Sequence, residues 1–200
     1  MFRHRFLASS IALLLGMWLT PDLSAQRGAL TVQRNLAELT SRADVILRGQ
    51  VVSAKFERHP DLRHLNTVLV SMRVKEVLKG SSPATYTFRQ YVWDVRDRFN
   101  TAGYRKGEQL LLMMNRPSQF GLTSPVGLEQ GRFRIVRNPS GALMAANGRG
   151  NAGLFANVLA PAQRKRIALS PAASKMLQTR SGAVPADDLS ELIRALVGKK

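Results

Sequence analysis

The sequence predicts a mainly β protein: a five-stranded barrel with a short N-terminal helix and a C-terminal helix. Residues 45–56 form a long apolar-rich run, and residues 67–75 alternate between apolar and polar side chains. Further strand-like runs follow before residue 146, and residues 187–197 repeat their leucines at helical spacing. Alternation with period two indicates half-buried strands, and a period near 3.6 indicates an amphipathic helix.

Residues 43–80 are predicted to form a long β-hairpin around which the chain is organised. The apolar face of its second arm is formed by Val68, Val70, Met72 and Val74. The first arm is apolar on both faces for part of its length, as in a strand that is covered on both sides. Gly49 lies inside this arm and predicts a bulge or bend, which a strand needs in order to turn the corner of a barrel.

The remaining strands are predicted to complete the barrel. Residues 85–93 are rich in Thr and aromatic side chains, residues 109–114 are almost wholly apolar, and a final hairpin surrounds the turn sequence Asn-Pro-Ser-Gly at residues 138–141. Five short strands, an early helix and a compact core together predict a barrel of the OB type.

The chain divides into four predicted parts. Residues 1–25 are a signal peptide, residues 26–146 an OB-like barrel domain, residues 147–186 a flexible basic segment rich in Gly, Ala and Ser, and residues 187–198 a C-terminal amphipathic helix. Within the second part, apolar residues at helical spacing predict a short helix over residues 31–43.

The N-terminus has the three parts of a secretory signal. Arg3 and Arg5 provide the positive start, residues 6–19 are predominantly apolar, and residues 23–25 resemble a cleavage site. The apolar stretch is shorter than the roughly 20 residues that a transmembrane helix needs. We therefore expect an exported protein, periplasmic or secreted, and the alternative is a membrane anchor through an uncleaved N-terminus.

Composition restricts the classes of function. The 30 Lys and Arg residues outnumber 13 Asp and Glu, which gives a formal net charge of +17 at pH 7. Such a charge favours anionic partners, although a solvated basic surface would give the same composition. The sequence contains no cysteine, which excludes a disulfide, a thiolate zinc site and a cysteine nucleophile.

Four stretches of the chain resemble a group of largely uncharacterised exported bacterial proteins. They are residues 36–53, 70–80, 106–114 and 127–138. The resemblance implies an OB-like barrel related to the fold of tissue inhibitors of metalloproteinases (the netrin-like fold). Inhibitors of that superfamily chelate the protease zinc through an N-terminal cysteine. Because this chain has no cysteine, that mechanism does not carry over.

The motifs contain no catalytic constellation. There is no glycine-rich phosphate loop and no G-x-S-x-G sequence, and His59 and His64 belong to one predicted exposed loop without a third metal ligand. We expect no enzymatic activity, no cofactor and no metal site. The alternative is a hydrolase whose site the sequence does not reveal.

The preferred hypothesis is a binding module for an unidentified protein or envelope ligand. Its site is predicted at the barrel mouth and in the loop of residues 94–107, where aromatic and guanidinium groups of the kind enriched at interfaces occur. The candidate residues are Arg89, Tyr91, Trp93, Arg96, Arg98 and Tyr104. For each of them, a cap on the barrel or a solvated arginine is the structural alternative.

The second hypothesis is binding of an anionic polymer such as a glycan, lipopolysaccharide or extracellular DNA. Arg89, Tyr91 and Trp93 on one strand face, with Arg132 and Arg134 on another strand, would give a basic surface on which rings can stack. Export argues against a cytoplasmic nucleic acid, and the export signal is the one predicted contact with a membrane.

Overall fold

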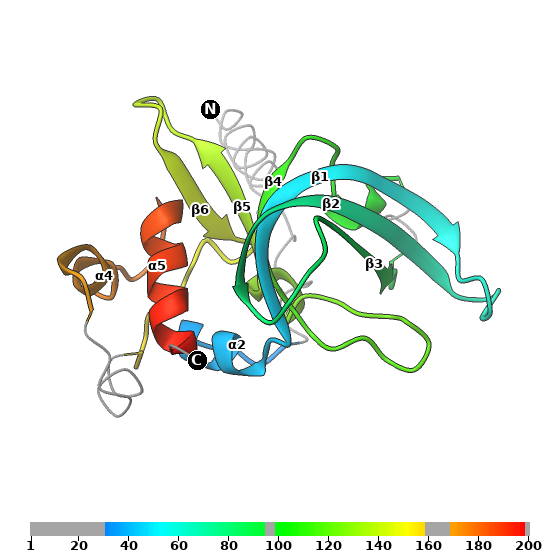
Figure 1. The fold of residues 1–200 in the computed structure, drawn as a ribbon, viewed down its shortest axis with the longest axis horizontal. Coiled ribbons are helices and arrows are strands. Elements are labelled where there is room, and N and C mark those ends of the chain that lie inside the picture. Colours follow the sequence, from blue (N-terminus) through cyan, green and yellow to red (C-terminus); the bar gives the residue numbers. More distant parts are fainter. Residues whose placement is uncertain (1–30, 95–98, 159–168, 199–200) are drawn as a thin grey trace, which may run out of the picture. The chain divides into compact units, whose positions relative to one another are not determined.

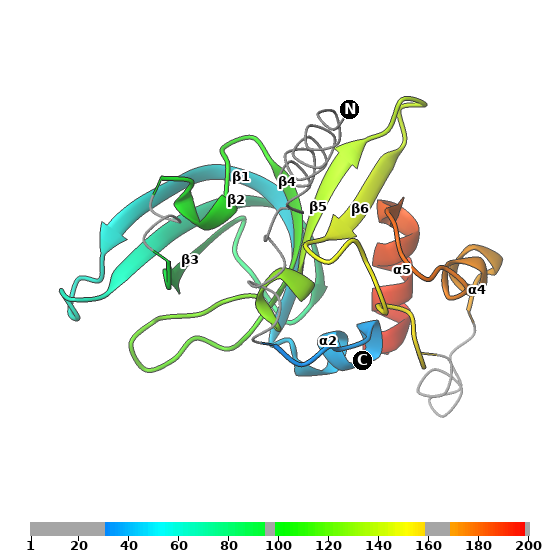
Figure 2. The same ribbon diagram turned by 180° about the vertical axis from the view of Figure 1, so that it is seen from behind.

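A single antiparallel sheet of seven strands forms the body of this protein. The structure is a computed structural model that describes residues 31–94, 99–158 and 169–198. The sheet has the order β3-β2-β1-β4-β5-β6-β7, and the helices gather beside β5 and β6 (Figures 1 and 2). Residues 1–25, predicted as a signal peptide, lie outside the described residues. None of the helices in the described ranges is long and apolar enough to span a bilayer.

The predicted long hairpin is confirmed. It consists of β1 (Val45–Arg58) and β2 (Asn66–Lys79), which pair along nearly their whole length. Their register shifts at three points, one of them at Gly49, and the pair arches strongly (Figure 1). A Cβ atom on Gly49 would lie 2.4 Å from the carbonyl oxygen of Arg73. Only glycine therefore allows the two backbones to approach this closely at the bend.

The predicted OB-like, TIMP-like barrel is wrong, because the sheet does not close. β3 (Thr85–Tyr91) forms one end of the strand order and β7 (Val184–Pro185) forms the other. β4 (Gln109–Met114) pairs with the first six residues of β1. β5 (Arg132–Arg137) and β6 (Leu143–Asn147) then extend the sheet away from β3. The terminal strands therefore do not meet.

Two separate hydrophobic cores explain why an open sheet is stable. The first lies between one sheet face and helices α2 (Leu36–Arg42), α4 (Pro171–Met176) and α5 (Ala186–Val197). The second fills the concave side of the arch formed by β1, β2 and β3. Strand β4 contributes alternate side chains to both cores, so that its residues 110–114 are all buried. In a barrel, this face of the sheet would be exposed to solvent; here the three helices cover it.

The predicted N-terminal and C-terminal helices are both present in the structure. Helix α2 begins at Leu36 rather than at residue 31, because Asn35 and Glu38 form a reciprocal capping box. Helix α5, predicted from its apolar stripe, is confirmed, and it packs on α2 and β2. Within residues 147–186, α4 and β7 are regular elements, while residues 159–168 lie outside the described ranges.

Two ion pairs tie α5 to the hairpin. Arg48 and Glu76 are cross-strand partners on β1 and β2. Arg48 pairs with Asp187 in the first turn of α5 at 2.5 Å, and Glu76 pairs with Arg194 in its last turn. The cation of β1 thus pairs with the first turn of α5, and the anion of β2 pairs with its last turn. Because the two pairs are not interchangeable, they define the direction in which α5 lies on the sheet.

Candidate functional site

The candidate site is the solvent-facing side of β1, β2 and β3, which we call the outer face. Residues directly opposite each other on paired strands share a face. Ser53 is opposite Ser71, which is opposite Thr87, and Arg73 is opposite Thr85. The outer face consists of Ser53, Lys55, Glu57, Thr67, Leu69, Ser71, Arg73, Lys75, Thr85, Thr87, Arg89, Tyr91 and Trp93. The opposite side of the same strands is the second core.

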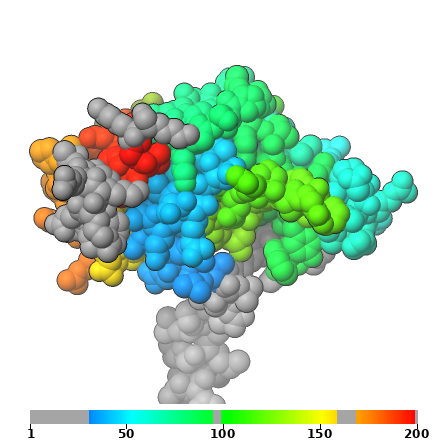
Figure 3. All heavy atoms as spheres, turned by 60° about the horizontal axis from the view of Figure 1, so that its bottom comes forward, coloured from blue at the N-terminus to red at the C-terminus, as the bar shows by residue number. Residues whose placement is uncertain are grey.

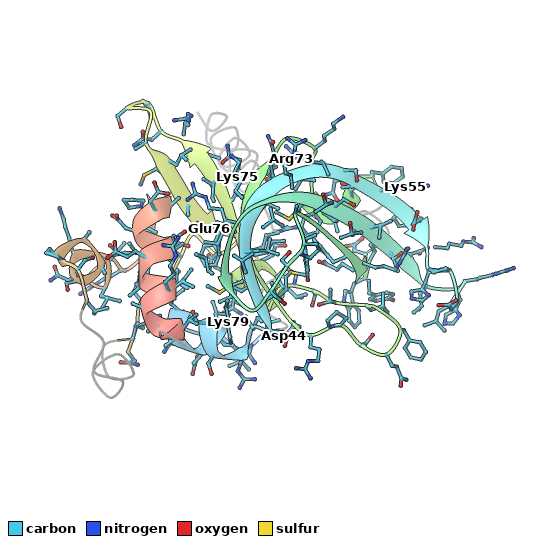
Figure 4. The ribbon with its side chains drawn as sticks, in the orientation of Figure 1. Asp44, Lys55, Arg73, Lys75, Glu76 and Lys79 are labelled. Carbon is cyan, nitrogen blue, oxygen red and sulfur yellow. The ribbon has the colours of Figure 1, made fainter. Side chains whose placement is uncertain are left out.

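Cations and hydroxyl groups line the outer face in rows across the strands. Lys55, Arg73 and Lys75 are exposed and lie along the outer side of the β1–β2 arch (Figure 4). Among the described residues, Arg73 and Lys75 have no ion-pair partner, whereas Lys55 lies 3.5 Å from Glu57. The hydroxyl groups of Ser71 and Thr87 hydrogen-bond to each other at 2.9 Å. The face thus offers unpaired positive charge next to groups that can donate and accept hydrogen bonds.

Arg89, predicted as a binding residue, is engaged within the sheet. Its guanidinium pairs with Glu57 at 2.7 Å and donates to the hydroxyl of Thr67 at 3.0 Å. That hydroxyl donates in turn to the carbonyl of Glu57 at 2.8 Å. The hydrogen bond from Arg89 is the main cause that lowers the pKa of Glu57, and so keeps this carboxylate charged. Arg89 therefore shapes the outer face but is not a free cation.

Tyr91 and Trp93 form an aromatic pair at the end of β3. Their rings meet edge to face, with centroids 5.0 Å apart, a preferred geometry for aromatic pairs. Trp93 is 80% exposed, and Phe99, beyond residues 95–98, is 88% exposed. Aromatic residues, Trp and Tyr above all, are enriched at the centres of interfaces. The two rings of the pair extend the outer face with surfaces on which a planar group can stack.

The other predicted site residues do not join this surface. Arg96 and Arg98 lie outside the described residues. Tyr104 is buried in the second core, where its hydroxyl donates to Gln90 at 2.8 Å and its ring meets Phe88 edge to face. The structure thus brings together Arg89, Tyr91 and Trp93, and it separates Tyr104 from them.

Arg132 and Arg134 also lie away from the outer face, in a charged cluster on β5. Arg132 is 6% exposed, binds the carboxylate of Glu129, and lies over the ring of Tyr104 with 4.6 Å between its guanidinium carbon and the ring centroid. Arg134 pairs with Glu108 at 2.9 Å. The prediction that these two arginines provide an exposed basic surface is therefore wrong for Arg132.

The charged cluster holds a strained turn in place. Thr101, Ala102 and Gly103 have φ angles of 51°, 53° and 79°, a left-handed conformation that costs a β-branched residue free energy. Arg132 donates to the carbonyl of Ala102 at 2.7 Å, and Arg134 to that of Gly103 at 3.4 Å. A cavity of about 50 Å³ lies beside Glu129, Arg132 and Gly148. It is far smaller than the roughly 300 Å³ at which small-molecule sites begin.

The burial of Tyr104 gives the folded protein a defined response to high pH. Burial raises the pKa of Tyr104 from 10.0 to about 12. Because the unfolded chain releases this proton first, the stability contributed by the protonated phenol is complete below pH 10 and is lost as pH rises through 12. We expect a loss of about 2–3 kcal/mol in the free energy of unfolding from this group.

Urea unfolding of wild type and Tyr104→Phe between pH 9 and 12 measures this loss. The variant has no phenol to ionise, so its stability should fall less steeply with pH, although it also loses the hydrogen bond to Gln90. The pKa of Tyr86 is raised as well, mainly by burial, and this contribution is common to both proteins. Parallel pH profiles would contradict the assignment.

His59 has a structural role, and the prediction that it lies in an exposed loop is wrong. The ring is buried, and its Nδ1 accepts hydrogen bonds from the backbone N–H groups of Asp61 and Leu62. Its Nε2 lies 2.8 Å from the carbonyl of Phe120, to which it must donate. The bond joins the hairpin end to the loop of residues 115–125, which Figure 3 shows in bright green beside the cyan hairpin end. Within the described ranges, no three His, Asp or Glu side chains gather around a possible metal position.

Sequence reasoning missed the cations of β2 as site residues. Arg73 and Lys75 lie on the polar side of the alternating arm, and this alternation was the signal that could have identified them. The alignment of Arg73 with Thr85 depends on the register between β2 and β3, which the sequence of either strand alone does not contain.

Comparison with known proteins adds no relative to this description. The chain matches no protein-family model, and no curated protein matches it.

Proposed function

We propose that this protein is an exported, non-enzymatic module that binds an anionic polymer on its outer face. The observation that carries the proposal is that one side of β1–β3 holds three features: cations without an ion-pair partner among the described residues, a hydroxyl row, and an aromatic pair whose Trp93 ring is exposed. A polymer needs an extended surface rather than a pocket. Cations along it contact the charged groups, hydroxyls exchange hydrogen bonds, and rings stack on sugars or bases.

Features of the sequence support both export and the class of partner. The N-terminal segment has signal-peptide features, and a net charge of +17 raises the local concentration of polyanions around the protein. Acidic glycan, lipopolysaccharide and extracellular DNA share the required chemistry, which is a repeated negative charge on an extended chain.

A pair of charge-matched variants tests the proposal. Arg73→Ser with Lys75→Ser removes two outer-face cations, and Arg42→Ser with Lys175→Ser removes two exposed cations from α2 and α4. Fluorescence anisotropy titration of a labelled sulfated polysaccharide and of labelled DNA should give a roughly tenfold or greater loss of affinity for the first pair at low salt. Trp93→Ala should cost about tenfold, the value of one stacking contact.

Two outcomes of that titration would contradict the proposal. If the control pair loses as much affinity as the outer-face pair, binding depends on total charge and not on this surface. If wild type binds equally well at low and high salt, charge does not drive the binding.

A protein partner is the second candidate function, and the exposure of Trp93 and Phe99 favours it. Large rings that water surrounds in the free protein are typical anchors of interfaces. A protein held by these rings would stay bound at high salt, and Phe99→Ala would release it. Polymer bound by the outer face would respond to Trp93→Ala and to salt, but not to Phe99→Ala.

A further inference from the structure

The outer edge of β3 pairs with no further strand in the described ranges. The register between β2 and β3 is unbroken, and the hydrogen bonds from Val74 N to the carbonyl of Ala84 and from Val92 N to the carbonyl of Asn66 define its phase. Hydrogen-bonding groups alternate sides along a strand. Even-numbered residues of β3 therefore bond to β2, and Thr85, Thr87, Arg89 and Tyr91 direct their N–H and C=O groups away from the sheet.

The rest of the described chain covers this edge only in part. The loop of residues 115–125 reaches it at one point, where Thr123 N donates to the carbonyl of Arg89 at 2.9 Å next to the bridge with Leu122. Thr85 and Thr87 are exposed. No residue in the described ranges bonds to their outward backbone groups.

The two edges of the sheet differ in protection. β7 has two residues, one of them Pro185, and helix α5 follows directly; short strands and proline are the usual means of blocking an edge. β3 has seven residues, Thr-Tyr-Thr-Phe-Arg-Gln-Tyr, with high β propensity, no proline, no lysine and no bulge. An open edge of this kind accepts an added strand. The backbone of the incoming strand forms hydrogen bonds with the N–H and C=O groups of the edge, which otherwise bond to water.

We propose that an extended acidic segment of another polypeptide adds to the edge of β3 at Thr85–Thr87. The charge of the surface beside the edge indicates which kind of segment binds there. Arg73 lies directly opposite Thr85, and neither Arg73 nor Lys75 has an ion-pair partner in the described part of the chain. A second copy of this chain would bring another net charge of +17 to the same place, and like charges oppose association. An acidic strand adds backbone hydrogen bonds and gains attraction to this surface.

This site borders the polymer surface and draws on the same cations, Arg73 and Lys75, but it does not rest on polymer binding. The polymer would contact side chains on the outer face, whereas an added strand needs the backbone groups at the edge. Thr87→Pro removes the outward N–H of residue 87 and leaves the bonds between β2 and β3 intact, since that N–H takes no part in them. Thr87→Val is the matched control: it removes the hydroxyl that bonds to Ser71 and keeps the N–H.

The test is fluorescence anisotropy of the purified full chain with a labelled peptide of alternating Glu and Thr. We expect saturable binding, a roughly tenfold weaker affinity for Thr87→Pro, as for the loss of one hydrogen bond, and little change for Thr87→Val. A peptide of alternating Lys and Thr should not bind. Thr87→Pro and Thr87→Val both lack the Thr87 hydroxyl of the outer face, so their polysaccharide affinities should equal each other while their peptide affinities differ. Failure of one proposal is thereby distinguishable from failure of the other.

Backbone methylation of the peptide tests the mode of binding without altering the protein. An added strand uses every second N–H of the incoming chain, so N-methylation of either the Glu residues or the Thr residues should abolish binding, and methylation of the other set should not. Equal effects of both methylations would overturn strand addition. Equal binding of the acidic and basic peptides would overturn the acidic occupant, and so would a dimer of the full chain in sedimentation that Thr87→Pro dissociates.

Discussion

Replacing Glu129 by alanine is expected to destabilise the protein by about 3–5 kcal/mol. Glu129 is the carboxylate partner of Arg132, whose side chain is 6% exposed. Without it, a nearly buried guanidinium keeps the carbonyl of Ala102 and the ring of Tyr104 as partners, but no negative charge. The desolvation of the cation is then uncompensated, which is the costly case for a buried ion pair. Urea unfolding measures the difference, since urea does not screen charges.

Glu108→Ala is the control for this prediction. Glu108 also pairs with an arginine of β5, but Arg134 is half exposed and remains hydrated when its partner is removed. The expected loss is therefore below about 1 kcal/mol. Combining Glu129→Ala with Arg132→Met should recover part of the loss, because the double variant buries no charge. Equal losses for the two Glu variants would mean that Arg132 is open to water.

This contrast also marks a limit of sequence reasoning. The sequence Arg-Phe-Arg-Ile-Val-Arg at residues 132–137 alternates, and alternation correctly predicts Phe133 and Ile135 in the core. It also predicts Arg132 and Arg134 on a solvated face. The turn of residues 101–103 contacts both arginines, but Arg132 is nearly buried while Arg134 stays half exposed. Nothing in the sequence of the strand itself indicates this difference.

The same distinction applies to the architecture. The hairpin, β4 and α5 were predictable because each leaves a periodicity or an apolar run within its own residues. Closure of the sheet is a property of which strands pair, and short apolar strands are compatible with an open sheet or a barrel. The start of α2 was predicted at residue 31, whereas Asn35 and Glu38, which have the spacing of a capping box, would have indicated the correct start.

For the candidate site, the residues of one strand could be predicted and their neighbours could not. Arg89, Tyr91 and Trp93 share a face because alternate residues of a strand do so. The capture of Arg89 by Glu57 and the alignment of Arg73 with Thr85 depend on the register of three strands. The open edge of β3 depends on the strand order of the whole sheet.

The second large effect is expected on β4, where neighbouring residues should be equally intolerant of truncation. Leu111 belongs to the core under the helices and Leu112 to the core inside the arch, and neither is exposed to solvent. Leu111→Ala and Leu112→Ala should each lower the free energy of unfolding by about 2–5 kcal/mol, from lost burial and from the cavity left behind. Val136→Ala on β5, where the side chain is 60% exposed, should change stability by less than about 0.5 kcal/mol.

Large losses at both positions require that apolar material covers both faces of the strand. A strand with one covered face would show the alternation familiar from half-buried sheets, with one costly and one tolerated substitution. Urea denaturation of the three variants therefore tests the two-core arrangement directly. A small effect for Leu111→Ala alone would mean that α2, α4 and α5 do not pack on the sheet in solution, and a small effect for Leu112→Ala alone would mean that the arch does not enclose a core.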